Sequence, residues 1–151
     1  MIAELKPVWK QFEETYSALR QALTAVPDDW LLWRPALGAT CVATIAQHVA
    51  GANVRYCNMI EHGERGRSWD VDDHADRELL LQRLALSEER VRSCLAGLDD
   101  AGLRRVIADR WHPLGPEVKG PLDAFWFAHQ IVRHSAYHLG QVNYILLLLG
   151  L

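Results

Sequence analysis

The sequence predicts an all-α protein that folds as a four-helix bundle. Apolar residues recur at three- and four-residue steps along four long segments, which is the period of an amphipathic helix. There is no strand–helix alternation and no glycine-rich phosphate loop, which argues against a nucleotide-binding α/β fold. With 151 residues, 50% of them hydrophobic, the chain is long enough to bury one core. We therefore expect a single domain over residues 1–151, in an up-down-down-up or related topology with long loops after the first three helices.

The first two predicted helices are separated by a loop that contains two prolines and a glycine. The first helix covers residues 2–25, where Leu5 and Trp9 begin an apolar stripe of helical spacing. The stretch "VPDDWLLWRPALGAT" interrupts this period and predicts a structured loop. The second helix covers residues 41–61, and Thr40 is its expected N-cap.

A polar, glycine-containing connection leads to the third predicted helix, which covers residues 76–98 and begins with acids that suit a helix N-terminus. The next connection contains several prolines and glycines, so a long helix is excluded there, although "RRVIADRW" can form a short extended segment. The last helix covers residues 121–149, because Pro121 is favourable in a first turn and the apolar period resumes after it.

Composition excludes several classes of partner. The formal net charge is −3 and no run of Lys or Arg exceeds two residues, so we expect no nucleic-acid partner. Three cysteines without C-x-x-C spacing, and an N-terminus without the apolar core of a signal peptide, favour reduced thiols in a cytoplasmic protein. The terminal "YILLLLGL" is too short to span a membrane. Its leucines cover all sides of a helix, so we expect a homodimer that buries part of this end.

The stretch "HSAYHLGQ" holds two histidines at a spacing that suits a shared ligand. His134 and His138 lie about 40° apart around a helix, on the apolar stripe that faces the core. Two buried imidazoles cannot both be charged without partners, and a metal ion removes this conflict. The H-x-x-x-H pattern is weak by itself, and taken alone it favours two hydrogen-bonded core histidines over a metal site. It also lacks the glutamate of the H-E-x-x-H proteases.

A third histidine strengthens the metal hypothesis. His48 lies in the second predicted helix and shares the inward face of that helix. Small residues around it, such as Ala46 and Ala50, would let a neighbouring helix approach closely. Three histidines from two helices can form a three-nitrogen site for a divalent ion that leaves coordination positions open, which is typical of catalytic zinc.

These motifs carry a resemblance to a family. The chain resembles the DinB/YfiT-like bundle proteins in "WLLWRPALGATCVATIAQHVAG" and in "HSAYHLGQVNYIL", and the resemblance covers essentially its whole length. It implies a four-helix bundle, often dimeric, with a divalent metal on His48, His134 and His138. Characterised relatives include thiol-S-transferases and thiol-dependent isomerases that use low-molecular-weight thiols such as bacillithiol or mycothiol. Many members have no assigned activity, and some have lost the three histidines.

Two further residues are candidates for the same site. Arg55 lies two turns beyond His48 on the same face and can bind a substrate carboxylate, although a surface salt bridge explains it equally well. Gln141 follows His138 by one turn and can orient that ligand, although a helix–helix hydrogen bond is the alternative.

Several functions remain open from the sequence. No general base is evident on the histidine faces, which favours metal-activated thiol chemistry over a metal-dependent hydrolase. The third candidate is a non-catalytic metal-binding or stress-related bundle protein. Three neutral nitrogens suit Zn or Ni best, and also accept Fe, Mn or Co.

Overall fold

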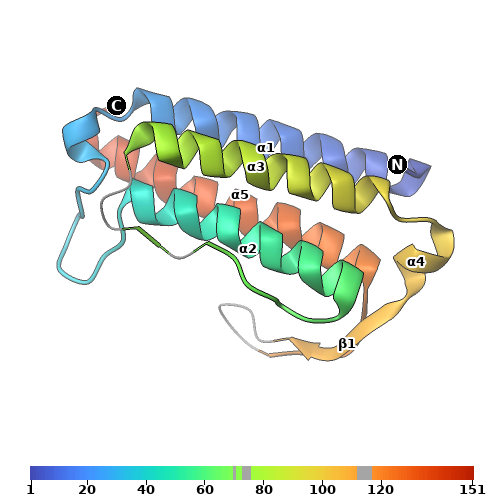
Figure 1. Ribbon diagram of the computed structural model, residues 1–151. Helices are drawn as coiled ribbons and strands as arrows, with labels where there is room; N and C mark the ends of the chain where they lie inside the picture. Colours follow the sequence, from blue (N-terminus) through green and yellow to red (C-terminus); the bar gives the residue numbers. More distant parts are fainter. Residues whose placement is uncertain (70, 73–75, 112–116) are drawn as a thin grey trace.

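A bundle of four long helices makes up most of the computed structural model, which describes residues 1–151 except 70, 73–75 and 112–116 (Figure 1). A short 3₁₀ turn, Ala3–Leu5, precedes the first helix, and a second one, Asp28–Trp30, lies in the loop that follows it. The bundle helices are α1 Lys6–Ala25, α2 Val42–His62, α3 Arg77–Ala96 and α5 Ala124–Leu149.

The four helices surround one core. Helix α2 contacts α3 and α5, and α1 contacts the same two helices from the other side. Figure 1 shows that α2 and α3 run in one direction, while α1 and α5 run in the opposite direction. This arrangement puts α2 directly beside α5, the two helices that carry the three histidines of the sequence motifs.

The sequence predicted an all-α protein, but the structure also contains a small sheet. A short helix, α4 Asp100–Arg104, is followed by strands β1 Val106–Trp111 and β2 Val118–Asp123, which pair antiparallel. Strand β1 lies in the stretch predicted to be extended. Strand β2 occupies residues assigned to the last helix, which therefore begins at Ala124 and not at Pro121. Pairing with β1 outweighs the preference of Pro121 for a first helical turn, and the Asp123 side chain accepts a hydrogen bond from the Trp126 amide at 2.8 Å to start α5.

The caps explain where two other helices begin and end. Thr40 is not the N-cap of α2; Cys41 holds that position and makes no capping hydrogen bond through its side chain. Helix α2 ends at Gly63, whose φ of 74° lies in the left-handed region that glycine tolerates. Helix α3 is capped by Asp76, which accepts a hydrogen bond from the Leu79 amide at 2.9 Å.

A buried polar network ties the four long helices together. Asn53 of α2 donates to the Tyr16 hydroxyl of α1 at 2.7 Å and lies 3.1 Å from the Ser135 hydroxyl of α5. The Tyr16 hydroxyl is also 2.9 Å from that of Ser87 on α3. All four side chains are inaccessible to solvent, so their hydrogen bonds favour one relative register of the helices.

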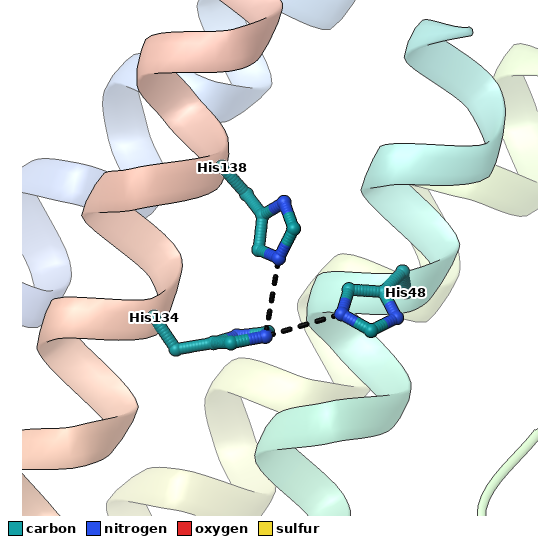
Figure 2. A group of neighbouring side chains, drawn as sticks. All are labelled: His48, His134 and His138. Carbon is teal, nitrogen blue, oxygen red and sulfur yellow. Dashed lines mark hydrogen bonds between the residues drawn. The ribbon is translucent and has the colours of Figure 1, made fainter. Parts of the chain in front are cut away.

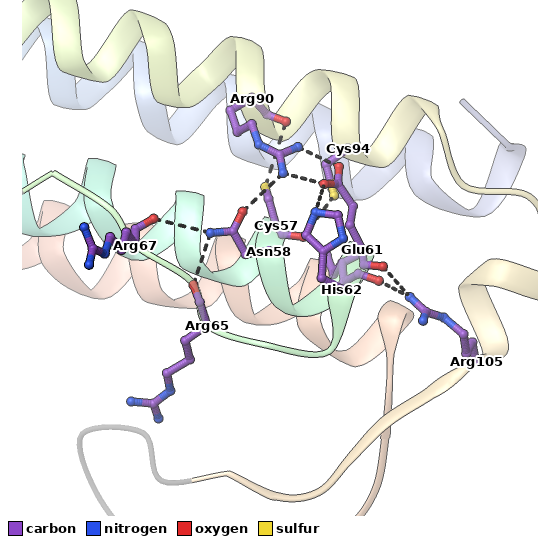
Figure 3. Close-up of polar contacts among 10 residues, drawn as sticks. Cys57, Asn58, Glu61, His62, Arg65, Arg67, Arg90, Cys94 and Arg105 are labelled. Atoms are coloured by element: carbon purple, nitrogen blue, oxygen red, sulfur yellow. Dashed lines mark hydrogen bonds and ion pairs between the residues drawn. The ribbon is translucent and has the colours of Figure 1, made fainter.

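The connection from α2 to α3 folds back along the outer face of α2 (Figure 1). The Gln47 amide pairs with the backbone of Asp72, donating to its carbonyl at 2.9 Å and accepting from its N–H at 2.8 Å. Asn58 donates to the Arg65 carbonyl at 3.1 Å, as Figure 3 shows. Arg55 donates to the Ser68 hydroxyl. These contacts hold Arg65, Ser68 and Asp72 against the helix that carries His48.

The apolar C-terminal end of α5 is only partly buried. Leu147 is 71% exposed and Leu148 47%, while Ile145 packs in the core. Among the described residues, no helix combines the length and the apolar character that crossing a membrane requires.

Candidate metal centre

Three histidine side chains from α2 and α5 converge in the space between the two helices (Figure 2). The His134 Nε2 atom lies 3.1 Å from His48 Nε2 and 3.1 Å from His138 Nε2. One ligand atom from each residue lies within 4.8 Å of the other two. Nitrogens bound to one zinc ion at ~2.0–2.1 Å would stand about 3–3.5 Å apart, so this geometry fits a single ion.

Hydrogen bonding alone does not satisfy the three nitrogens. Each imidazole nitrogen has one in-plane site, which holds either a hydrogen or a lone pair. His134 Nε2 therefore makes a true hydrogen bond with either His48 or His138, but not with both at once. A cation between the rings accepts all three lone pairs together. The three-histidine group can thus hold a metal ion.

The protonation state of the rings suits metal binding. Burial, followed by the neighbouring His138, lowers the pKa of His48 to about 4. Burial, followed by the other two histidines, lowers the pKa of His134 to about 3. Burial also lowers the pKa of His138. All three imidazoles are therefore neutral at pH 7, which is the form that binds a metal.

The tautomer of His138 is set by Gln141. His138 Nδ1 lies 2.7 Å from the Gln141 side-chain oxygen, which can only accept, so Nδ1 carries the hydrogen and Nε2 keeps its lone pair. The amide nitrogen of Gln141 donates to the Tyr137 hydroxyl at 3.3 Å, which agrees with this orientation. By contrast, His134 Nδ1 is buried and has no hydrogen-bond partner in the described part of the chain.

Comparison with known proteins agrees with the fold and the motifs. The model of the DinB superfamily matches residues 11–142. The chain belongs to the DinB superfamily. A crystal structure of a conserved protein from Enterococcus faecalis superposes with a TM-score of 0.75 at 15% identity, covering 96% of each chain, which shows a shared fold. No curated protein matches the sequence.

Arg55 lies beside the histidines of this DinB-superfamily chain. Its positive charge contributes to the lowered pKa of both His48 and His134. The guanidinium is half-buried and donates to the Ser68 hydroxyl, and no acid among the described residues pairs with it.

One neighbour of the site was not identified from the sequence. Tyr56 packs edge-on against His134, with ring centroids 5.6 Å apart, and its other side meets Trp111 of β1 at 5.7 Å. Tyr56 lies eight residues after His48 in α2, a spacing that could have pointed to the same side of the helix. Nothing near Trp111 in the sequence signals its position, because the hairpin brings it there. Tyr56 therefore packs an aromatic ring against His134, and Trp111 contacts that ring.

Proposed function

We propose that the protein is a metal-dependent enzyme of the thiol-S-transferase or thiol-dependent isomerase type. The observation that carries the proposal is the convergence of three neutral histidine nitrogens without a fourth metal-binding side chain among the described residues. A site with three protein ligands keeps a coordination position for a substrate. Zn or Ni is the preferred ion, and Fe, Mn and Co are compatible with the same nitrogens.

The chain contributes position and charge to this chemistry. His48, His134 and His138 would hold the ion, and Gln141 keeps His138 in the ligating tautomer. When bound, a divalent ion lowers the pKa of a coordinated thiol or water. In net terms a thiol R–SH and an electrophile R′–X give R–S–R′, with H–X released. We propose that Arg55 binds the carboxylate of the thiol or of its acceptor.

Two alternatives belong to other classes, namely a metal-dependent hydrolase and a non-catalytic, stress-related metal-binding protein. Hydrolysis at such a centre commonly uses a carboxylate or another base beside the metal-bound water. In the described part of the molecule, the metal-capable group holds only histidines. Because no described carboxylate belongs to this group, we favour a low-molecular-weight thiol as the nucleophile.

Elemental analysis of the purified protein tests the metal centre. Wild type should contain one divalent ion per subunit, and His138→Ala should contain almost none. His129→Ala is the matched control, because His129 lies on the same helix but is exposed and packs against Phe125. Metal content that is the same in wild type and His138→Ala would disprove the ligand assignment.

Activity assays then separate the three functional classes. Metal-loaded protein is incubated with an electrophile, with and without bacillithiol or mycothiol, and separately with an ester. Thiol-dependent consumption of the electrophile that is lost in His138→Ala supports the proposal. Ester hydrolysis without a thiol would support a hydrolase, and neither activity in a metal-loaded protein would support a non-catalytic role.

A further inference from the structure

A cavity of about 370 Å³ lies between α5 and the loop that precedes α2. Pro35, Ala39 and Thr40 line the loop side of this cavity, and residues between Tyr137 and Ile145 of α5 line the other side. The loop wall is fixed by Arg34, which donates to the Ala39 carbonyl at 2.7 Å. The volume falls in the range of about 300–1,000 Å³ that is usual for sites of small ligands.

The floor of the cavity contains a glycine that the fold itself does not explain. Gly140 lies inside α5, where glycine costs about 1 kcal/mol relative to alanine. A Cβ atom at this position would meet no other atom within 4 Å, so no neighbouring helix requires the missing side chain. Its φ is not in the left-handed region either. The bare backbone is instead open to whatever occupies the cavity, which can approach α5 closely.

The lining of the cavity defines the chemistry of its occupant. None of the side chains that line it carries a formal charge at pH 7. The largest of these side chains are Tyr137 and Tyr144. Ile145 also lines the cavity and is buried in the core. The tyrosines are partly exposed, so an ionised ligand would lose part of its hydration here without gaining an ion pair from the lining. The cavity therefore suits an uncharged and mainly apolar molecule, for which the tyrosine rings offer flat contact surfaces.

The cavity shares one side chain with the metal centre. Gln141 lines the cavity and also accepts the hydrogen bond from His138 Nδ1 at 2.7 Å. Its amide nitrogen donates to Tyr137, another residue of the lining. A molecule that displaces this amide therefore alters the support of a metal ligand, and the two sites are linked through one hydrogen-bonded chain.

We propose that this cavity binds the uncharged apolar part of a small molecule, which serves as the electrophilic substrate of the DinB-superfamily centre. This assignment of a substrate class rests on the proposed function, but the binding site stands on the cavity, Gly140 and the uncharged lining. Substrate recognition is then divided. The cavity selects the apolar part, and the metal centre provides the reacting position.

Calorimetric titration with 1-naphthol tests the site, and 1-naphthoate serves as a charged counterpart with the same ring system. Wild type should bind naphthol saturably and naphthoate at least tenfold more weakly. Gly140→Leu fills the cavity and should weaken naphthol binding at least tenfold. Leu147→Ala, a change at an exposed residue of the same helix, should leave naphthol binding unchanged. No saturable binding of naphthol to wild type, or equal binding to Gly140→Leu, would overturn the proposal.

Two additional measurements keep the outcomes distinct. Tyr144→Ala removes a wall instead of filling the space, so weaker naphthol binding in this variant excludes misfolding of Gly140→Leu as the cause. Sedimentation of the Gly140→Leu protein addresses a second copy of the chain as the occupant. If wild type is a dimer that does not bind naphthol saturably, and Gly140→Leu is a monomer, the cavity is part of a subunit contact. That result would reject the proposal. The titrations are made with and without zinc. If zinc does not bind, the proposed function is rejected, but the naphthol titration still shows whether the cavity binds an apolar molecule.

Discussion

The His138 ring and the Gln141 amide are joined by a hydrogen bond of 2.7 Å between Nδ1 and Oε1 within one turn of α5. This contact selects the tautomer whose Nε2 lone pair points toward His134, and thus toward the point where the three histidines can hold a metal ion. The same amide lines the cavity beside the centre. One glutamine therefore connects the support of a metal ligand with the walls of a second site.

Replacing Gln141 should weaken metal binding without unfolding the protein. Gln141→Leu removes the acceptor for His138 Nδ1–H and leaves the ring free to rotate or change tautomer. We expect zinc affinity to fall by roughly 10- to 100-fold, as is usual when a partner of a metal-bound histidine is lost. Competition with a chromophoric chelator measures the affinity. Asn143→Leu, at an exposed position on the same helix, should bind zinc like wild type. Equal affinities in all three proteins would show that the hydrogen bond does not support the ligand.

The buried hydroxyl of Tyr16 should contribute strongly to stability. Tyr16→Phe keeps the ring but removes the partner that Asn53 and Ser87 share. Ser87 is inaccessible to solvent, so its hydroxyl cannot exchange this bond for water. We expect a loss of about 1–3 kcal/mol in the free energy of unfolding. Urea denaturation measures it, with Tyr144→Phe as the control, because Tyr144 is 60% exposed and should change the free energy by less than ~0.5 kcal/mol.

An ion pair between α2 and α3 should make stability depend on acid. Arg90 holds Glu61 through two contacts, at 2.6 and 2.5 Å, as Figure 3 shows. This hydrogen bonding lowers the pKa of Glu61 below its ordinary value. The folded form thus prefers the ionised carboxylate, and its contribution is present above the unfolded pKa of about 4.3 and is lost as the pH falls through the lower folded pKa.

We compare wild type with Glu61→Gln. Both proteins are first treated with a chelator, so that release of metal in acid does not affect the measured free energy of unfolding. The free energy of unfolding of wild type should fall more steeply with acidification below about pH 5 than that of the variant. Because both partners are partly exposed, high salt should reduce the difference. Parallel pH profiles in the two proteins would mean that this pair does not contribute.

The exposed leucines at the end of α5 lead us to expect a homodimer. Leu147 is 71% exposed, Leu148 47% and Leu151 54%, which is a costly arrangement for an isolated subunit. Sedimentation at micromolar concentration should give a mass near twice 17.1 kDa. Leu147→Lys should shift the protein to the monomer, whereas Leu86→Lys, at a 52% exposed position of α3, should not. A wild-type protein that sediments as a monomer would contradict the expectation.

Local periodicity was sufficient to predict only part of the candidate metal centre. Helical spacing alone puts His134 beside His138, and both on the inward face of the helix. The position of His48 relative to this pair depends on how α2 packs on α5, and small residues in α2 hinted at that close packing. The hairpin was harder to foresee, because strand pairing depends on partners outside each segment. The contact between Tyr56 and Trp111 was missed for the same reason.

Arg55 offers the sharpest test of ligand selection at the centre. Its half-buried guanidinium donates to Ser68 and pairs with no acid among the described residues. Its positive charge contributes to the lowered pKa of His48 and of His134. A half-buried positive charge that meets no described acid can form a charge-assisted pair with an anion that binds there. If that anion is a substrate carboxylate, Arg55→Ala should keep the metal but lose one charge-assisted interaction of about 1.5–3 kcal/mol. Such a loss corresponds to binding that is weaker by about tenfold or more.

Calorimetric titration of zinc-loaded protein with a carboxylate-bearing thiol such as bacillithiol provides the measurement. Arg55→Lys retains the charge but cannot bind a carboxylate in bidentate fashion, so its affinity should lie between those of wild type and Arg55→Ala. Arg92→Ala is the control, because Arg92 is exposed on α3 and pairs with Glu89 of the same helix. Normal thiol binding by Arg55→Ala, together with a small loss of thermal stability, would instead assign Arg55 to holding Ser68 and the connection that follows α2.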